Sequence, residues 1–290
     1  MSRVIVITGT SSGIGLETAL RCAQLGGTVV ATMRNLERSA KLDDAADRLG
    51  IELHKEQLDI TDPSSRTNAI ERIIAKHGGI DVLVNNAGYA VYGPFEYCPP
   101  EDVELMFQTN VLGTMEITRL VLDIMRRQGR GSIINVSSTM GVITMPLLST
   151  YSATKFAVVG WSDALRAELR PMGIQVCSVE PGTVETDFLG RSMVRYAPRD
   201  DDHVYRRYWY GLERNMDPRR SILPMSAASK VASRIARLCF SRKLPAHAPI
   251  GLDAHLATLG RIFFGVTRLR SILARFVYLL GRQSVSTDSK

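Results

Sequence analysis

Short runs of apolar and β-branched residues recur along the chain, and longer segments with a helical repeat of apolar positions separate them. This alternation predicts βαβ units, and hence a parallel sheet covered by helices on both faces. An uninterrupted run such as Val4 to Ile7 indicates a strand that is buried on both sides. We therefore expect a doubly wound α/β (Rossmann) fold. The expected strands are Val4–Thr8, Thr28–Thr32, Glu52–Leu58, Val82–Asn85, Ser132–Ser137 and Ile174–Val179.

The same pattern marks where helices end and where regularity is lost. The glycine pairs Gly26-Gly27 and Gly78-Gly79 predict the ends of helices that precede strands. From Phe188 to Leu223 the periodicity dissolves into charged and aromatic residues. Beyond it we expect one helix near Ala227–Cys239 and a last, amphipathic helix over Leu259–Leu280.

Length and composition are those of an ordinary globular protein. The 290 residues can bury one large core, and no segment resembles a linker. We expect one domain at 1–250 and a C-terminal amphipathic helical extension at 251–290. Hydrophobic and charged fractions of 45% and 22% argue against disordered, collagen-like and disulfide-scaffold classes. The formal charge of +7 is compatible with nucleic acid, an anionic membrane surface or a phosphorylated cofactor as partner.

Four cysteines, Cys22, Cys98, Cys177 and Cys239, lie far apart without a C-x-x-C pair. The spacing indicates neither a metal site nor a disulfide framework, so we expect free thiols and a reducing, cytoplasmic location. The N-terminus leads directly into the first strand, so we expect no secretory signal. No stretch approaches the roughly 18 apolar residues that a membrane-spanning helix requires.

A glycine-rich segment from Thr8 to Gly15 joins the first strand to a helix that we expect to begin near Ile14. Glycines let the backbone turn sharply and approach a pyrophosphate, which the exposed N–H groups of the helix favour. The spacing Gly-x-x-x-Gly-x-Gly departs from the commoner Gly-x-Gly-x-x-Gly, and a turn without ligand is the alternative. The candidate phosphate-binding residues are Gly9, Ser11, Ser12, Gly13 and Gly15.

The second strand bears on the choice of nucleotide. An NAD site usually places a carboxylate at the end of this strand, where it binds the ribose 2'-hydroxyl. Here the strand leads into Met33, Arg34 and Asn35, without an acid. Arg34 offers a planar cationic group suited to a 2'-phosphate, which favours NADP(H). A solvated surface arginine is the alternative.

Tyr151 and Lys155 are four residues apart in a segment predicted to be helical, so they share one face. A free tyrosine has a pKa near 10, which makes it a poor base at neutral pH. A neighbouring ammonium stabilises the phenolate, and we therefore expect Lys155 to lower the pKa of Tyr151. By itself such a pair is common on helix surfaces.

Taken together, these segments resemble the short-chain dehydrogenases/reductases from Met1 to about Phe188. The motifs that carry the resemblance, in order, are Thr8 to Gly15, Asn85-Asn86-Ala87-Gly88, Asn110, Ser137-Ser138, Tyr151-x-x-x-Lys155 and Pro181-Gly182. The resemblance implies that Tyr151 exchanges the proton, that Lys155 lowers its pKa and binds the nicotinamide ribose, and that Ser138 binds the substrate oxygen. It also implies that Asn110 holds a water in a proton relay. The alternatives are a strand-end hydroxyl for Ser138 and a helix-kink amide for Asn110.

Further cofactor contacts are implied by the resemblance alone. Asp59 looks like the adenine contact, although alone it is typical of a turn, and Asn86 and Gly88 look like the wall beside the adenosine ribose. Val184 and Thr186 look like the residues that hold the nicotinamide carboxamide. The remaining implied contacts are Ile14, Pro181 and Gly182.

In this family a substrate lid usually follows the Pro-Gly motif, and we place it at about 188–223. Its tyrosines and arginines suit an apolar substrate with one carbonyl or hydroxyl, and resemble the 17β-hydroxysteroid and retinol dehydrogenase branch. The alternative is that the aromatic residues form the core of the lid and that the arginines lie on its solvent-exposed face.

The last predicted helix has an apolar side opposite arginines that recur every seven residues from Arg261. An anionic bilayer is one partner for such a helix, and the domain itself or a second subunit is the other, which Arg270 favours by interrupting the apolar side. No nucleic-acid motif is present, so we expect no nucleic acid as partner.

The sequence thus predicts an NADP(H)-dependent oxidoreductase that interconverts a lipophilic ketone or aldehyde and its alcohol. The resemblance also implies a homodimer or homotetramer, with the helices after Glu101 and Tyr151 in the interface. The alternatives are a non-catalytic NADP(H) sensor and a membrane-surface binding protein on the same fold.

Overall fold

The computed structural model describes residues 2–185 and 192–285, and the side chains of Val266 and residues 282–285 are not described. Its centre is a seven-stranded sheet in the order β11-β7-β6-β4-β1-β2-β3, with every neighbouring pair parallel. The strands are β1 (Val4–Thr8), β2 (Thr28–Met33), β3 (His54–Gln57), β4 (Val82–Asn85), β6 (Gly131–Val136), β7 (Ile174–Pro181) and β11 (His247–Ile250).

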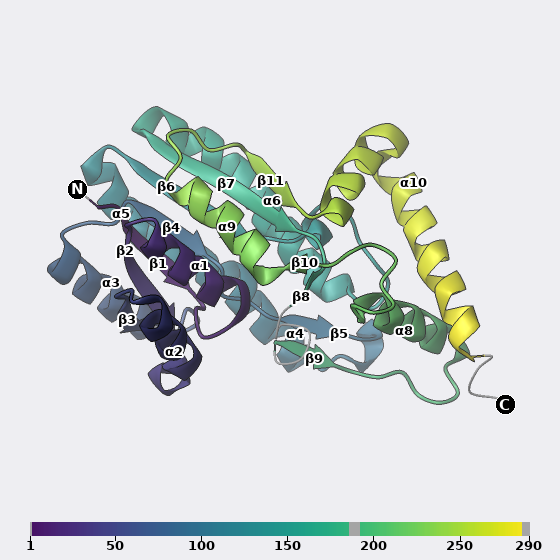
Figure 1. Cartoon of the computed structure of the whole chain (residues 1–290). Helices are drawn as coiled ribbons and strands as arrows, with labels where there is room; N and C mark the ends of the chain where they lie inside the picture. Colours follow the sequence, from purple (N-terminus) through teal and green to yellow (C-terminus); the bar gives the residue numbers. More distant parts are fainter. Residues whose placement is uncertain (1, 186–191, 286–290) are drawn as a thin grey trace.

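Helices cover both faces of this sheet (Figure 1). Ile5 and Ile7 of β1 pack into the core beneath α1 (Gly13–Gln24), α2 (Ala40–Leu49) and α9 (Ala228–Cys239). Val6, between them, points to the other face, which α3 (Pro63–His77), α5 (Thr114–Gln128) and α6 (Ser149–Leu169) cover. The two cores arise because successive side chains of a strand point to opposite faces. The predicted doubly wound α/β fold is therefore confirmed.

The six predicted strands are present, with differences of a few residues at their ends. The seventh strand, β11, was not predicted, because its four residues His-Ala-Pro-Ile lack a run of β-branched side chains. It pairs with β7 at the edge of the sheet, where a proline costs no ladder hydrogen bond on the open side. The paired glycines end their helices as predicted, and Gly78 has the left-handed φ of 74°.

The order of the strands determines where a site can form. The chain passes from β1 to β2 and β3 on one side, then returns to β4, β6, β7 and β11 on the other. At such a switch point the loops after neighbouring strands diverge to opposite faces and leave a crevice at the carboxyl ends. The loops after β1 and β4 meet there, and Asn86 donates from Nδ2 to the carbonyl oxygens of Thr8 and Gly9 at 2.9 and 3.0 Å.

Smaller elements build the region above this edge. Short strands pair as β5 (Ala90–Tyr92) with β9 (Met193–Arg195) and β8 (Val184–Glu185) with β10 (Ser226–Ala227). Helix α4 (Pro100–Phe107) continues through a π-helical turn at Gln108–Gly113 into α5. Single 3₁₀-helical turns lie at Leu36–Ser39, Phe95–Tyr97, Thr139–Gly141 and Arg170–Met172.

The segment predicted to be irregular contains helix α8 (His203–Met216). Its apolar repeat is weak because only Gly211 and Leu212 are buried. Trp209 stacks on the buried Tyr92 with ring centroids 4.5 Å apart. Tertiary contacts therefore stabilise a helix that the sequence pattern does not predict.

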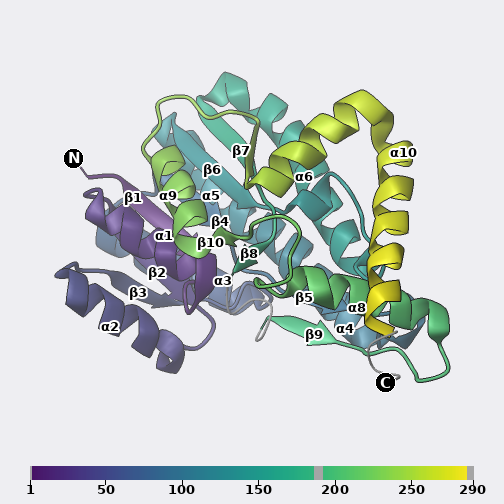
Figure 2. The same ribbon diagram turned by 45° about the vertical axis from the view of Figure 1, so that its right-hand side comes forward.

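The last helix, α10, is longer than predicted and is not straight. It runs over Leu252–Val285 and is interrupted at Gly265, where φ is 69° and ψ is 162°. Figure 2 shows the two halves of α10 meeting at a corner at the edge of the molecule. Among the described residues, no helix is both long enough and apolar enough to cross a membrane.

The second half of α10 packs closely on α8. A Cβ on Gly211 would lie 2.1 Å from the carbonyl oxygen of Val277, and a Cβ on Gly281 would lie 1.9 Å from that of Arg207. Arg207 also donates to the hydroxyl of Tyr278 at 2.8 Å. Arg270, expected to interrupt the apolar side, instead places its guanidinium over the ring of Phe156 in α6.

Candidate active site

A cavity of about 620 Å³ lies at the carboxyl ends of the strands. One part of its wall is the loop after β1 and the start of α1, and another is formed by α6 and the segments after β4, β6 and β7. The remaining wall is apolar and comes from α8 and α10. The cavity thus joins a polar, glycine-lined end to an apolar end, and Tyr151 is among the residues that line it.

The glycines of the first loop are required by its geometry. Gly9 has a φ of 70° and Gly13 a φ of 58°, a region that side chains disfavour. A Cβ on Gly9 would lie 2.8 Å from the Cα of Ala87, and one on Gly15 would lie 2.2 Å from the carbonyl oxygen of Gly9. The loop therefore brings its backbone to the cavity wall without side chains in between.

Helix α1 points its N-terminus at this loop. Ser12 precedes the helix in an extended conformation and, within the described part of the chain, its hydroxyl makes no capping hydrogen bond. The first turn carries no acidic residue. Gly9, Ser11, Ser12, Gly13, Ile14 and Gly15 all line the cavity. The N-terminus of a helix carries a partial positive charge and exposed N–H groups. Because the glycines leave space beside these groups, the loop fits the pyrophosphate of a dinucleotide.

Tyr151, Ser138 and Lys155 meet on the cavity wall. Tyr151 and Lys155 lie one turn apart on α6, and both are buried. Ser138, two residues after β6, forms a side-chain hydrogen bond with Tyr151 and accepts one from the backbone N–H of Met140 at 3.1 Å. Lys155 Nζ donates to the carbonyl oxygen of Val136 at 3.0 Å and lies 5.7 Å from the centre of the Tyr151 ring.

Burial shifts the pKa of both titrating groups toward the neutral form. It raises the pKa of Tyr151 to about 12, and the Ser138 hydrogen bond opposes this only in part. Burial likewise lowers the pKa of Lys155 to about 8. The sequence predicted a lowered pKa for Tyr151, and the net direction is the opposite because desolvation of the phenolate outweighs the stabilising contact. Tyr151 is therefore a neutral phenol at physiological pH.

Asn110 lies in the π-helical turn between α4 and α5, beside this group, and is buried. Its Nδ2 donates to the carbonyl oxygen of Tyr89 at 2.8 Å and to the hydroxyl of Thr154 at 3.2 Å, and its Oδ1 accepts from the Tyr89 N–H at 3.0 Å. A Cβ on Gly88 would lie 2.9 Å from Asn110 Oδ1 and 3.9 Å from Lys155 Nζ. Both amide hydrogens are thus engaged within the protein.

Two predicted cofactor contacts, Arg34 and Asp59, are near the polar end but do not line the cavity. Arg34 is exposed directly after β2, whose last residue Met33 is buried. Asp59 accepts hydrogen bonds at Oδ1 from the backbone N–H and hydroxyl of Thr61, at 2.9 and 2.7 Å. Asp59 therefore forms the turn that its residue type alone predicts, at the carboxyl end of β3.

The segment after β7 forms another part of the cavity wall. Pro181, Gly182 and Val184 line it, as do Asn86 and Gly88 after β4, whereas Thr186 falls outside the described residues. Asp253, in the first turn of α10, was not predicted here. Its Oδ2 accepts from the Thr183 N–H at 2.6 Å, and a Cβ on Gly182 would lie 1.9 Å from its Oδ1. Only the fold places this carboxylate, 70 residues away in sequence, in the cavity wall.

The apolar end of the cavity is built mainly from segments outside the classical motifs. Met140, Ile143, Met145 and Leu148 contribute from the loop and helix start before Tyr151. Helix α8 adds Leu212 and Met216, and the loop beyond it adds Ile222 and Leu223. Helix α10 contributes Leu256, Ala257, Leu269, Leu273, Phe276, Val277 and Leu280.

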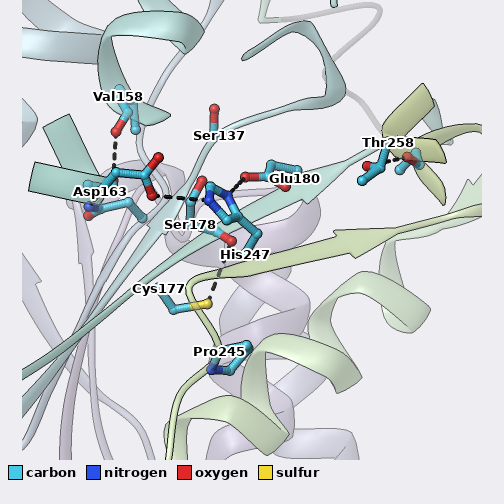
Figure 3. Close-up of polar contacts among 12 residues, drawn as sticks. Ser137, Val158, Asp163, Cys177, Ser178, Glu180, Pro245, His247 and Thr258 are labelled. Carbon is cyan, nitrogen blue, oxygen red and sulfur yellow. Dashed lines mark hydrogen bonds and ion pairs between the residues drawn. The ribbon is translucent and has the colours of Figure 1, made fainter. Parts of the chain in front are cut away.

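A polar cluster of His247, Glu180 and Asp163 lies between β7, β11 and α6 (Figure 3). His247 of β11 sits between two carboxylates, 2.7 Å from Glu180 Oε1 through Nδ1 and 3.1 Å from Asp163 Oδ1 through Nε2. Glu180 is buried next to Pro181, and Asp163 belongs to α6. The Glu180 hydrogen bond in particular raises the pKa of His247. The cluster ties β11 and α6 to the strand that ends at the cavity.

The four cysteines are buried free thiols. Within residues 2–185 and 192–285, no group of three or more His, Cys, Asp or Glu side chains is arranged to hold a metal ion. Hydrogen bonding with Cys22 and burial raise the pKa of Cys239.

Comparison with known sequences places this site in context. A family model described as short chain dehydrogenase matches residues 3–195. The chain is 33% identical over 288 residues to an uncharacterized oxidoreductase, YusZ, of Bacillus subtilis (strain 168), covering 95% of this chain and 99% of that protein. It is 37% identical over 203 residues to a 3-ketodihydrosphingosine reductase of Bacteroides thetaiotaomicron, covering 70% of this chain and 72% of that one.

Solved structures with the same fold include proteins with either nicotinamide cofactor. A short-chain dehydrogenase from Streptomyces avermitilis matches with a TM-score of 0.76 at 31% identity, over 90% of this chain and 92% of that one. A variant of the actinorhodin polyketide ketoreductase with NADPH matches with a TM-score of 0.73 at 28% identity, over 86% and 96%. A 3-ketoacyl-(acyl-carrier-protein) reductase from Brucella melitensis with NADH matches with a TM-score of 0.71 at 26% identity, over 86% and 96%. The family match spans the glycine loop and Tyr151 with its neighbours, and the chain therefore belongs to the short-chain dehydrogenase/reductase family of oxidoreductases.

Proposed function

We propose that this oxidoreductase is an NADP(H)-dependent reductase of lipophilic ketones or aldehydes, with Tyr151 as general acid. The observation that carries the proposal is the position of Tyr151 between the two ends of one cavity. Its hydroxyl is hydrogen-bonded to Ser138, and Lys155 Nζ lies 5.7 Å from the centre of its ring. The glycine loop lines one end of the cavity, and apolar side chains line the other.

The polar end fits a nicotinamide dinucleotide. We propose that Gly9, Ser11, Ser12, Gly13 and Gly15 hold the pyrophosphate, and that Lys155 holds the nicotinamide ribose. Asn86, Gly88 and Asp59 would surround the adenosine half. The nicotinamide would be surrounded by Pro181, Gly182, Val184 and Thr186, with Ile14 nearby. When bound, the cofactor supplies or accepts a hydride. The protein's task is then to hold the carbonyl and to supply a proton.

Ser138 and Tyr151 converge on the position of a carbonyl oxygen. Both hydroxyls can donate to it, so the negative charge that develops on oxygen during reduction is stabilised. With a pKa of about 12, Tyr151 is protonated at neutral pH and is the form that reduction needs. Lys155 offers a nearby cation as the phenolate forms. Because both amide hydrogens of Asn110 are engaged with Tyr89 and Thr154, a relay water would have to donate to one of its oxygens, the side-chain Oδ1 or the backbone carbonyl.

The apolar end supports a lipophilic substrate. The side chains that line it from α8 and α10 are apolar, apart from Asn215 of α8 and Asp253 at the start of α10. Such a wall binds by shape and burial of apolar surface. A panel of steroids, retinoids, fatty carbonyls and aromatic ketones, followed by nicotinamide absorbance, tests the substrate class. Turnover of small polar ketones in preference to all of these would contradict it.

Because solved relatives hold NADPH in one case and NADH in another, the cofactor preference has to be argued from Arg34. Its exposed guanidinium follows β2 without a carboxylate at that position. A charge-assisted bond to a 2'-phosphate is worth about 1.5–3 kcal/mol, so Arg34→Ala should weaken NADPH binding by roughly 10- to 100-fold. NADH binding should hardly change. Fluorescence titration of both nucleotides measures this.

Arg38→Ala is the matched control, since it removes another exposed arginine four residues further along. Arg38→Ala should retain the NADPH preference, because losing one positive charge away from the 2'-phosphate should change NADPH affinity much less than losing Arg34. Equal affinity of the wild type for NADPH and NADH would show that Arg34 does not select the nucleotide.

We also propose a homodimer or homotetramer assembled through the helices that follow Glu101 and Tyr151. Leu105 of α4 and Leu112 of the π-helical turn are 47% and 46% exposed, which favours a covering subunit. Leu112→Glu should shift the mass in light scattering toward the monomer, whereas Leu49→Glu, at an equally exposed leucine of α2, should not. A monomeric wild type at micromolar concentration would contradict this assembly.

A further inference from the structure

The corner of α10, residues 259–268, exposes apolar side chains that nothing in the structure covers among the described residues. Ile262, Phe263 and Phe264 are 69%, 77% and 56% exposed, and Leu259 is 51% exposed. Single exposed apolar side chains are ordinary, but four of them within six residues form a contiguous patch. Patches of this kind mark a surface that meets a partner or a membrane.

The backbone at Gly265 makes the patch project. Its φ of 69° and ψ of 162° lie in a region that is essentially restricted to glycine. The chain therefore turns there, and Figure 2 shows the corner at the outer edge of the molecule. The half of α10 beyond the corner is held against α8 through the close contacts of Gly211 and Gly281. The corner thus has a fixed position relative to the cavity.

Positive charge surrounds the patch. Arg261 and Arg268 are exposed within the corner, and Arg275 is exposed further along α10. From Leu252 to Val285 the sequence has one carboxylate, Asp253, which is engaged with the Thr183 N–H. Apolar side chains flanked by arginines, without acids, are the features of a helix that lies in the interface of an anionic bilayer.

A second copy of the chain fits this surface less well. A two-fold interface brings a patch against itself, so the patch must be self-complementary. Here the arginines of one corner would face those of the other, without acids on α10 to pair with them. An anionic bilayer offers charge complementarity and an apolar interior together.

We propose that the corner of α10 docks on an anionic lipid bilayer, with Ile262, Phe263 and Phe264 inserted among the acyl chains and Arg261 and Arg268 at the headgroups. The docking surface is restricted to this corner, because Leu269, Leu273 and Phe276 beyond it line the cavity. The same helix therefore meets the bilayer on one side and walls the cavity on the other.

Docking on a bilayer also indicates a class of substrate, an inference that rests on the proposed function. A carbonyl compound with a long apolar chain resides in a bilayer and is scarce in water. Docking would place the α10 wall of the cavity beside that reservoir. The substrate inferred is a membrane-resident, single-chain lipid carbonyl, for which the chamber between α8 and α10 supplies apolar surroundings.

Vesicle sedimentation of the full chain tests docking without any catalytic readout. We expect binding to vesicles of phosphatidylcholine with phosphatidylglycerol, weaker binding to phosphatidylcholine alone, and release at high salt. The Phe263→Ser variant should bind vesicles at least about tenfold more weakly, because the apolar surface of the phenylalanine ring is no longer transferred from water into the bilayer. Arg261→Gln combined with Arg268→Gln should lose about 30-fold on the anionic vesicles only.

Phe95→Ser is the matched control, because Phe95 is 65% exposed but lies far from α10 in sequence and does not line the cavity. It should bind vesicles as the wild type does. Equal partitioning of wild type and Phe263→Ser, or a wild type that ignores anionic vesicles, overturns the proposal. Loss of dimers rather than of vesicle binding in Phe263→Ser would assign the corner to a second copy instead.

Activity assays separate docking from catalysis. With a short-chain ketone in solution, Phe263→Ser and the arginine variant should turn over like the wild type, since none of these residues lines the cavity. With a long-chain ketone in anionic vesicles they should be slower by the factor lost in partitioning. Vesicle binding without turnover of any carbonyl would refute the proposed function and leave docking standing. Equal rates of variants and wild type on the vesicle substrate would refute delivery from the bilayer.

Discussion

Replacing Tyr151 with phenylalanine should reduce kcat for carbonyl reduction by at least about 100-fold, which is typical of losing a general acid. The substitution keeps the ring, which packs with the residues around Tyr92 and Leu148, and removes only the hydroxyl. NADPH binding should remain within about twofold, because the glycine loop, Arg34 and Lys155, which we propose hold the nucleotide, are unchanged. Steady-state kinetics and nucleotide titration measure the two effects separately.

Tyr210→Phe controls for the loss of a tyrosine hydroxyl, since Tyr210 bonds to Arg206 in α8 and does not line the cavity. It should keep nearly full turnover. A Tyr151→Phe enzyme with most of its activity would falsify the mechanism. A wild type that binds NADPH tightly but reduces no carbonyl would instead support the non-catalytic sensor considered from the sequence.

The pKa of Tyr151 adds a pH test of the same mechanism. Because that pKa is raised to about 12, the phenol that reduction requires is fully populated from acidic to mildly alkaline pH. The reverse reaction, oxidation of the alcohol, requires phenolate as a base, so its rate should climb with pH through the alkaline range. Reduction that itself climbs with pH in step with oxidation would argue against Tyr151 as the acid.

The sheet and the polar end of the cavity could be predicted from sequence because local residues determine them. Continuous apolar runs marked β1 and β4 to the residue, and the glycines of the first loop are placed where only a missing Cβ allows the contact with Ala87. The spacing of Tyr151 and Lys155 needed only one turn of helix. These features depend on neighbours within a few residues.

The apolar end could not be predicted in the same way, because it is made by contacts distant in sequence. Helix α8 depends on stacking of Trp209 against Tyr92, and the helical repeat of α10 gave no sign of the break at Gly265. The sequence left open whether α10 packs against the domain or is exposed. In the structure its second half packs on α8, and its corner is exposed. Asp253 reaches the cavity wall only because β11 returns the chain there.

The pKa of Tyr151 shows a further limit of sequence reasoning. The pair Tyr151 and Lys155 predicted a lowered tyrosine pKa from charge alone. Burial of both groups reverses the net direction, and Leu212 of α8 and Val277 of α10 belong to the cluster that buries Tyr151. Spacing reports which groups are neighbours, but the dielectric around them is a property of the whole fold.

Lys155→Met should abolish most turnover and weaken NADPH binding together, and it should also change how stability depends on pH. The folded-state pKa of Lys155, about 8, lies below its ordinary value of 10.5 because the ammonium is buried. Below pH 8 both states hold the proton and the full cost of burial is present. Between the two values the unfolded chain binds more protons than the native one, so wild-type stability rises with pH.

The methionine variant lacks this contribution. From about pH 7 to about pH 9.5 the wild type should therefore gain about 2 kcal/mol in free energy of unfolding relative to Lys155→Met. Urea unfolding of both proteins at the two pH values measures the difference. Lys230→Met, at an exposed lysine of α9, should follow the wild type, because that ammonium stays in water when the chain folds. Parallel pH dependence in the wild type and Lys155→Met would mean that the ammonium beside Tyr151 is solvated, and the role assigned to it would have to be abandoned.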